Sequence, residues 1–268
     1  MLIKRIYSSV ILVALVVIAV LNRWVFNAAL TALTVLGLYE FFTMLERKGI
    51  PCFKYFGIGM GAVIPLSIMF RFELTRKWEL LFIMLALLFL FMMQFKRRQS
   101  QGAVVGISTT IFGILYISWF FSFLIRIRLL ENGVGLFAAI LLITKLGDVG
   151  AYLVGARFGK RPLIPRISPK KSVEGAIAGL VFSVLGALVA KPWLSFSYGH
   201  MILIGAFGGI LGQLGDLSES LMKRDCQVKD SSEIIPGFGG VLDLIDSLLF
   251  TAPVFYFYVH IVLGAMEL

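Results

Sequence analysis

Charged residues are scarce in this chain. Only 15% of its 268 residues are Asp, Glu, Lys or Arg, whereas 59% are hydrophobic, and the mean hydropathy is +0.93. A soluble domain carries about 25% charged residues, and so few charges cannot cover a water-soluble globule of this length. Cysteine is scarce too, since Cys52 and Cys226 could form at most one bridge, which excludes a disulfide-stapled fold. The composition therefore predicts a polytopic membrane protein.

The charge that is present is mostly positive, and the chain carries a net charge of +10. In a soluble protein this excess would suggest a nucleic-acid partner, but the sequence has no motif typical of DNA or RNA binding. At a membrane, the same excess favours anionic lipid headgroups and phosphorylated substrates. We therefore expect membrane lipids, and no nucleic acid, as partners.

Nine apolar segments are long enough to span a bilayer, which takes about 20 apolar residues per helix. The first follows Lys4 and Arg5 as a secretory signal would, but without a clear cleavage site, and we interpret it as an uncleaved anchor. The sequence thus predicts an all-α, polytopic integral membrane protein with about nine transmembrane helices. The predicted spans lie near residues 6–21, 24–45, 55–70, 80–95, 104–124, 135–152, 173–190, 200–217 and 246–264.

The distribution of positive charge orients these spans, because Lys and Arg favour the cytoplasmic side of a membrane. With the N-terminus inside, seventeen Lys and Arg residues fall in cytoplasmic segments and seven in external ones. We therefore expect a multi-pass protein of the cell's inner (plasma) membrane, with a cytoplasmic N-terminus and an external C-terminus.

The carboxylates divide the chain into two parts. Every aspartate lies between Asp148 and Asp246, whereas the acidic residues of the first 147 positions are all Glu. Ionisable groups at membrane depth are costly enough to indicate function. We expect an amino-terminal scaffold of about five helices at residues 1–134, and a catalytic region with its site at the cytoplasmic face at residues 135–268. Glu40 stays open between a functional role and burial near a helix end or pairing with Arg47.

Four aspartates lie at the predicted cytoplasmic ends of helices. Asp148 and Asp216 each end a span in the sequence Leu-Gly-Asp, and Asp243 and Asp246 stand three residues apart at the start of the last span. Carboxylates at helix C-termini oppose the helix dipole, and a bound divalent cation would offset that cost. Oxygen ligands without a Cys/His cluster favour Mg²⁺ over zinc. The sequence predicts that Asp216, Asp246, Asp243 and Asp148 bind Mg²⁺, with a second cation left open.

Groups suited to binding phosphate accompany these acids. The segment Pro236-Gly-Phe-Gly-Gly240 precedes a helix start and can turn backbone N–H groups toward an anion. Each feature alone has an ordinary explanation: a glycine-rich turn, a basic topology signal, or a solvated helix start. Their combination indicates metal-assisted phosphoryl or nucleotidyl transfer. The side-chain donors are Lys170, Lys171, Lys223, Arg224 and Lys229.

The carboxy-terminal part resembles the phosphatidate cytidylyltransferase (CDP-diglyceride synthase) family. The family pattern of a Ser, Lys-Arg, Lys-Asp, Pro-Gly-His-Gly-Gly and Asp-Arg-x-Asp is matched over 27 residues with its spacing intact. The matching residues are Ser220, Lys223-Arg224, Lys229-Asp230, Pro236-Gly237-Phe238-Gly239-Gly240 and Asp243-Leu244-Ile245-Asp246. Ser168-Pro-Lys170-Lys171 with Glu174-Gly175, and Gly215-Asp216-Leu217 with Glu219-Ser220, also resemble family patterns.

This resemblance implies the reaction of CTP with phosphatidate to give CDP-diacylglycerol and pyrophosphate in phospholipid biosynthesis, with Mg²⁺ as cofactor and CTP and phosphatidate as partners. A homodimer is left open. The catalytic residues it implies are Asp216, Asp243, Asp246, Lys223 and Arg224. The substrate-binding residues it implies are Ser168, Lys170, Lys171, Glu174, Ser220, Lys229, Asp230, Gly237, Gly239 and Gly240.

Two positions depart from the family pattern. Phe238 stands where the family usually has His, and Leu244 where it usually has Arg. These changes remove two groups that could contact phosphate or carry a proton, but the acids and the Lys/Arg positions remain, so we expect an active enzyme. The alternatives are a CTP-dependent enzyme acting on another lipid, such as a polyprenol kinase or a CDP-archaeol synthase, and an ion-coupled transporter whose intramembrane acids bind Na⁺ or H⁺.

Overall fold

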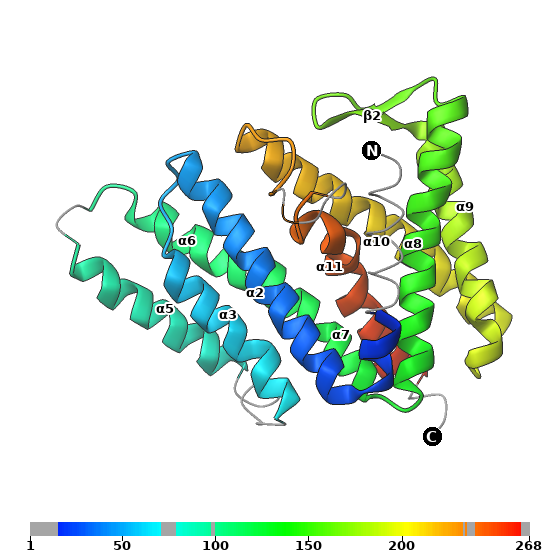
Figure 1. Cartoon of the computed structure of the whole chain (residues 1–268), viewed down its shortest axis with the longest axis horizontal. Coiled ribbons are helices and arrows are strands. Elements are labelled where there is room, and N and C mark those ends of the chain that lie inside the picture. Colours follow the sequence, from blue (N-terminus) through cyan, green and yellow to red (C-terminus); the bar gives the residue numbers. More distant parts are fainter. Residues whose placement is uncertain (1–15, 71–78, 98–99, 233, 235–238, 264–268) are drawn as a thin grey trace. The chain divides into compact units, whose positions relative to one another are not determined.

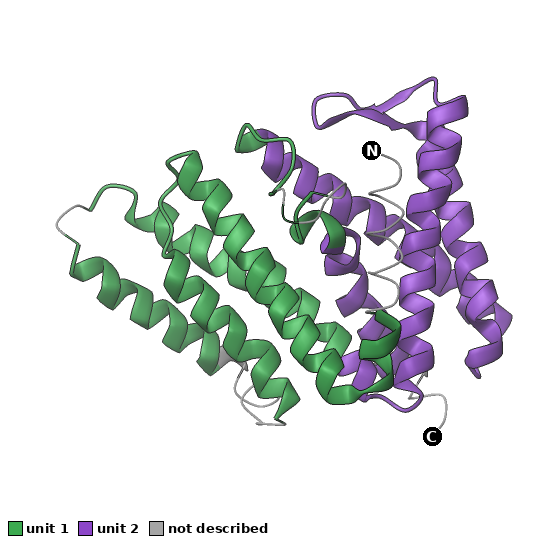
Figure 2. Ribbon diagram, viewed as in Figure 1, with its two compact units in different colours: residues 1–125, 225–244 green, residues 126–224, 245–268 purple. Residues whose placement is uncertain are grey.

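A computed structural model describes residues 16–70, 79–97, 100–232, 234 and 239–263 (Figure 1). Nearly all of the regular structure is helical, which confirms the all-α prediction. One small antiparallel hairpin, β1 (Pro162–Ile164) and β2 (Ser168–Ser172), is the exception, and it pairs Pro162 with Ser172. The chain forms two compact units, residues 1–125 with 225–244 and residues 126–224 with 245–268 (Figure 2).

The first unit is built from helices of the amino-terminal half. Within it α2 packs on α3, and α5 packs on α6. Asn22 caps α2 by accepting hydrogen bonds from the backbone N–H groups of Trp24 (2.9 Å) and Val25 (3.3 Å). Its elements are α2 (Arg23–Arg47), α3 (Lys54–Met69), α5 (Glu79–Phe95), α6 (Ala103–Gly113), the π-helical turn η1 (Ile114–Trp119) and the first part of α7 (Phe120–Leu129).

The second unit contains the hairpin and most of the long carboxy-terminal helices. In it α8 and α9 pack against each other. The chain enters this unit within α7 and returns to it within α11, between Leu244 and Ile245. Its helices are α8 (Gly133–Phe158), α9 (Val173–Ala190), the 3₁₀ turn η2 (Lys191–Trp193), α10 (Tyr198–Asp225), α11 (Leu242–Phe257) and the π-helical turn η3 (Tyr258–Leu263).

The helices correspond to the predicted spans, but α8 and α10 continue past the predicted ends at 152 and 217, so Asp148 and Asp216 lie within helices and not at their ends. Among the described residues, six helices are long and apolar enough to cross a membrane, and two shorter apolar helices, Lys54–Met69 and Leu81–Phe95, match the predicted third and fourth spans. The predicted first span, 6–21, lies mostly outside the described residues, although 16–21 are helical. The chain is thus a multi-pass membrane protein, while the count of nine spans stays a prediction. A helix is the natural form of such apolar runs, because it satisfies every backbone polar group internally.

Glycines let the helices of the second unit approach closely. A Cβ at Gly205 of α10 would lie 2.7 Å from the Cα of Val184 on α9, and one at Gly208 would lie 2.6 Å from the Ile143 side chain on α8. A Cβ at Gly215 would overlap the backbone oxygen of Asp246 on α11. The glycine series of α10 therefore serves close helix packing, as its spacing indicates. It brings α8, α9 and α11 against α10 near the acidic residues.

Candidate active site

Three of the four predicted aspartates belong to the second unit, one on each of three helices. Asp148 lies on α8, Asp216 on α10 and Asp246 on α11. The charges of Asp148 and Asp216 act electrostatically on Asp246, whose surface is only 7% exposed. The Oδ1 of Asp246 accepts a hydrogen bond from the backbone N–H of Ser247 at 2.5 Å. The tight packing at Gly215, next to Asp216 in sequence, brings α10 and α11 together at this point.

Two lysines place positive charge among these carboxylates. Lys145 Nζ lies 3.2 Å from Asp148 Oδ2 and 3.2 Å from the Ser247 hydroxyl. Lys171, from β2, lies 2.5 Å from Asp216 Oδ2. The cluster therefore holds anionic and cationic groups that can exchange partners when a phosphate or a cation binds.

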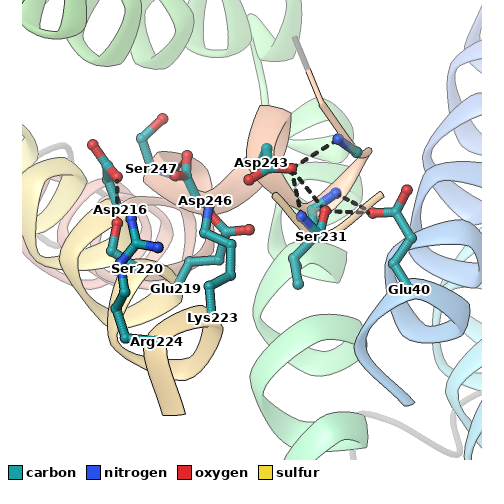
Figure 3. A network of polar contacts seen from close by, with 12 residues as sticks. Glu40, Asp216, Glu219, Ser220, Lys223, Arg224, Ser231, Asp243, Asp246 and Ser247 are labelled. Atoms are coloured by element: carbon teal, nitrogen blue, oxygen red, sulfur yellow. Dashed lines mark hydrogen bonds and ion pairs between the residues drawn. The ribbon is translucent and has the colours of Figure 1, made fainter. Parts of the chain in front are cut away.

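The last turns of α10 carry a second set of charged groups (Figure 3). Lys223 Nζ lies 3.0 Å from Glu219 Oε2, and both residues are buried. The Ser220 hydroxyl lies 3.4 Å from Asp216 Oδ1, a long hydrogen bond one turn along the helix. Arg224 donates from Nε to the backbone oxygen of Ile167 at 3.2 Å, which ties the end of α10 to the hairpin. Glu219, which the sequence analysis named only as part of a family-like pattern, therefore enters the site as the partner of Lys223.

The hairpin and the start of α9 hold the other predicted residues of this unit. Lys170 is exposed, and Ser168 is partly exposed. The Oε2 of Glu174 accepts hydrogen bonds from the backbone N–H groups of Lys160 (3.0 Å) and Arg161 (3.2 Å), so in this structure it holds the turn before β1. The Ser172 hydroxyl caps α9 by accepting from the Gly175 N–H at 3.1 Å. These contacts position the segment that carries Lys171.

Asp243 has a different set of contacts, within the first unit. Its Oδ2 accepts hydrogen bonds from the Gly240 N–H (2.7 Å), the Ser231 N–H (3.0 Å) and the Ser231 hydroxyl (2.8 Å). The carboxylate therefore joins Ser231 to Gly240, just before α11 (Figure 3). The expectation that Asp243 and Asp246 present one shared face to a metal stays a prediction.

The other predicted residues of this loop are only partly described. Lys229 and Asp230 are exposed. Gly239 has a φ of +96°, a left-handed conformation that favours glycine, and a Cβ there would lie 2.7 Å from Asp243 Oδ2. Gly237 and Phe238 lie outside the described residues. The roles of Gly237, Gly239 and Gly240 as phosphate binders stay predictions.

The backbone N–H groups at the start of α11 already have acceptors. Those of Val241 and Leu242 donate to the carboxylate of Glu40 on α2 at 2.9 Å and 2.8 Å. The sequence analysis expected N–H groups here to face a ligand anion, whereas the described ones face carboxylates of the chain itself. Glu40 is buried, at 2% exposed; the sequence analysis left it open between a functional role and burial near a helix end or pairing with Arg47. Its partners Val241 and Leu242 lie 201 and 202 residues away in the sequence, and no local pattern around Glu40 points to them.

The predicted magnesium site can be tested against this donor set. In the part of the chain that the structure describes, no three Asp, Glu, His or Cys side chains converge as a metal site. The carboxylates of Asp148, Asp216 and Asp246 nevertheless fit a hard cation in kind, because they are oxygen ligands that act electrostatically on one another. The ammonium groups of Lys145 and Lys171 form ion pairs with Asp148 and Asp216, which shows that positive charge is favoured at these positions. The Mg²⁺ assignment stays a prediction.

Comparison with known proteins shows the family. The model of the cytidylyltransferase family matches residues 3–262, nearly the whole chain. The chain belongs to the cytidylyltransferase family. The family match extends the resemblance beyond the carboxy-terminal motifs to the amino-terminal helices.

Members of the cytidylyltransferase family from several bacteria are similar to this chain. A phosphatidate cytidylyltransferase of Synechocystis is 34% identical, with 98% of each chain covered. One of Haemophilus influenzae is 31% identical, over 96% of this chain and 99% of the relative. One of Bacillus subtilis is 42% identical over 53% of this chain and 54% of the relative. The resemblance stated from the motifs is therefore confirmed.

Proposed function

We propose that this chain transfers the cytidylyl group of CTP to phosphatidate, forming CDP-diacylglycerol and releasing pyrophosphate. Its membership of the cytidylyltransferase family, with full-length relatives named for this reaction, is the observation that carries the proposal. The joint presence of carboxylates and lysines on α8, α10, α11 and the hairpin supports it, because transfer at a phosphate requires both kinds of group.

The proposed step is a displacement at the α-phosphorus of CTP. A phosphate oxygen of phosphatidate attacks this phosphorus, a new P–O–P bond forms, and the bond to the β-phosphate breaks, so that pyrophosphate leaves with the electron pair. No side-chain nucleophile is needed, because phosphatidate is already an anion at neutral pH. The residues of the chain therefore bind and orient the two substrates.

The basic residues are proposed to bind the phosphates. Lys171 pairs with Asp216, and Lys223 pairs with Glu219. Each lysine can exchange its carboxylate partner for a substrate phosphate when one binds. Arg224 offers a planar guanidinium suited to two phosphate oxygens. Exposed Lys170, Lys229 and Asp230, with Ser168 and Ser220, complete the proposed set, and Glu174 holds the turn before β1 beside them.

The acidic residues are proposed to hold Mg²⁺. Asp216 and Asp246 are the main ligands, and Asp148 is a further one. When bound there, the cation would neutralise charge on the phosphates of CTP and on the leaving pyrophosphate. Asp243 is another candidate ligand, and its contacts join Ser231 to Gly240.

The proposed site faces the cytoplasm, where CTP is present. The excess of Lys and Arg in alternate connecting segments supports a cytoplasmic N-terminus. With this orientation, the hairpin, the segment before α11 and the C-terminal ends of α8 and α10 are proposed to face the cytoplasm. Phosphatidate would reach this site from the adjacent leaflet.

The proposal is tested with purified protein in detergent and CTP labelled at either the α- or the γ-phosphorus. With phosphatidate, the α-label should enter a lipid product and the γ-label should be released as pyrophosphate, and EDTA should abolish both. Polyprenol is the second acceptor. Transfer of γ-label to polyprenol would identify a lipid kinase instead, and no transfer to either lipid would contradict a CTP-dependent enzyme.

A further inference from the structure

The carboxylate of Glu40 connects three segments of the first unit. Its Oε1 accepts hydrogen bonds from the Ser232 hydroxyl (2.5 Å) and the Val241 N–H (2.9 Å), and its Oε2 accepts from the Ser231 hydroxyl (3.1 Å) and the Leu242 N–H (2.8 Å). Figure 3 shows the side chain reaching from α2 toward this loop. Four donors on one buried carboxylate form a fully engaged hydrogen-bond centre.

The start of α11 explains why an acid is needed at this point. The first N–H groups of a helix have no partner within the helix and carry partial positive charge. Val241 and Leu242 supply two such groups, and the Glu40 carboxylate satisfies both. An uncharged side chain of the same shape would lose the attraction to the helix start and one of its acceptor oxygens.

The surrounding backbone is built to admit Glu40. A Cβ at Gly240 would lie 2.5 Å from Glu40 Oε2 and would also overlap the Ser231 hydroxyl. Only glycine leaves room for the carboxylate and the serine together. Asp243 binds the same serine from the other side, through the Ser231 N–H and hydroxyl. Two acids thus hold Ser231 and the backbone N–H groups of residues 240–242, where α11 begins.

We infer that Glu40 is a positioning residue for the proposed reaction: from the amino-terminal helix α2, it fixes the loop before α11 and the direction in which α11 begins. α11 carries Asp246 one turn after its start, so a shift of this start would displace a proposed Mg²⁺ ligand. The role in catalysis rests on the proposed function, whereas the hold on α11 rests on the hydrogen bonds alone.

Hydrogen exchange of the intact protein in detergent tests the hold directly. In Glu40→Gln, the Val241 and Leu242 amides should exchange faster by roughly ten- to a hundredfold, because each loses part of a hydrogen bond to a charged acceptor. Exchange in α8 and α9 should stay unchanged. The matched control is Glu46→Gln on the same helix, where Glu46 forms a half-exposed ion pair with Lys54 at 3.0 Å. This control should leave the α11 amides as in the wild type.

Steady-state kinetics test the consequence for turnover. Glu40→Gln should lower kcat by roughly ten- to a hundredfold with little change in the KM for CTP, as expected of a misplaced catalytic group. A purely structural role would reduce the yield of folded enzyme and leave kcat per folded molecule intact. Ser232→Ala removes one donor to Glu40 and should change exchange and kcat in the same direction by less. It decides the matter if Glu40→Gln does not fold.

Unchanged exchange of Val241 and Leu242 in Glu40→Gln, or in Ser232→Ala where only that variant folds, would overturn the inference. So would faster exchange with an unchanged kcat, because the loop would then not position the site. Wild-type protein that transfers no cytidylyl group would overturn the proposed function, while the exchange measurement would still decide whether Glu40 holds the start of α11.

Discussion

Individual carboxylates of the second unit differ in how much the proposed reaction needs them. Asp216 and Asp246 are expected to be indispensable, because replacing either with Asn keeps the shape but removes the anion that a hard cation requires. Asp216→Asn and Asp246→Asn should each abolish cytidylyl transfer while the protein still inserts and purifies normally. Asp225→Asn is the matched control, since Asp225 is exposed and pairs with Lys48 at 2.7 Å. An Asn variant at Asp216 or Asp246 with a near-normal rate would show that its carboxylate is structural.

The two departures from the family pattern also belong to the scale of single residues. We expect the double substitution Phe238→His with Leu244→Arg to change the rate of CDP-lipid formation modestly. One added charge-assisted phosphate contact is worth about 1.5–3 kcal/mol, roughly ten- to a hundredfold at most. Wild type and double variant are assayed side by side. An inactive wild type with an active double variant would mean that Phe238 and Leu244 disable the natural site.

The two free thiols give a prediction about pH. Burial raises the pKa of the Cys52 thiol, and the negative charge of Glu46 raises it further. Burial, followed by the charge of Asp225, raises the pKa of Cys226. Only the thiolate reacts. Alkylation at pH 7.5 should therefore be much slower in the folded protein than in the SDS-unfolded chain. The rate in the folded protein should increase as the pH rises past the ordinary thiol pKa. Mass spectrometry after iodoacetamide treatment measures both sites. Equal rates in folded and unfolded protein would contradict the protection.

At the scale of helices, the approach of α10 to α11 decides where Asp216 and Asp246 lie. A Cβ at Gly215 would overlap the backbone oxygen of Asp246, whereas one at Gly212 would meet its nearest neighbour, the Ser247 backbone oxygen, at an ordinary 3.7 Å. Gly215→Ala should therefore force the helices apart, lowering thermal stability and activity together. Gly212→Ala, one turn earlier on the same helix, should change both little. Comparable melting temperatures for the two variants would show that α10 and α11 adjust without cost.

The helices themselves follow from local sequence. Runs of apolar residues about 20 long predict a helix in a bilayer, and eight of the predicted spans correspond to described helices. The hairpin at residues 162–172 had no such signal, because its strands are short and contain Pro162 and Pro169. Its pairing depends on the ends of α8 and α9, which bring the two strands together.

At the scale of the whole molecule, the prediction concerns orientation in the membrane. In protein whose Cys52 and Cys226 are replaced by Ser, a cysteine introduced at Lys191 should react with an impermeant reagent added outside the cell. Cysteines at Pro165 or Asp230 should react only after the membrane is opened, because those segments carry the positive charge that favours the cytoplasm. External labelling at Asp230 would reverse the topology and remove the supply of CTP from the proposed site.

The predicted division of the chain shows the limit of reasoning along the sequence. The scaffold role of residues 1–134 stays a prediction, and the compact units group residues 225–244 with the amino-terminal helices, which no local pattern in the sequence indicates. Glu40 illustrates the reason: its donors lie in residues 231–242, where the serines and backbone N–H groups carry no pattern that points to α2. The sequence shows that Glu40 lies in an apolar helix, but it does not show which distant segment contacts its carboxylate.

The sequence by itself determined the membrane class, the positions of the helices and the family, because hydropathy and motif spacing are local properties of the chain. Only the tertiary structure decided which acid meets which base. It separated the contacts of Asp243 from those of Asp246, although the two lie three residues apart, and it joined Lys171 to Asp216 and Glu40 to the start of α11. Such pairings depend on how closely helices pack, and at Gly215 and Gly240 that closeness depends on the absence of a single Cβ atom.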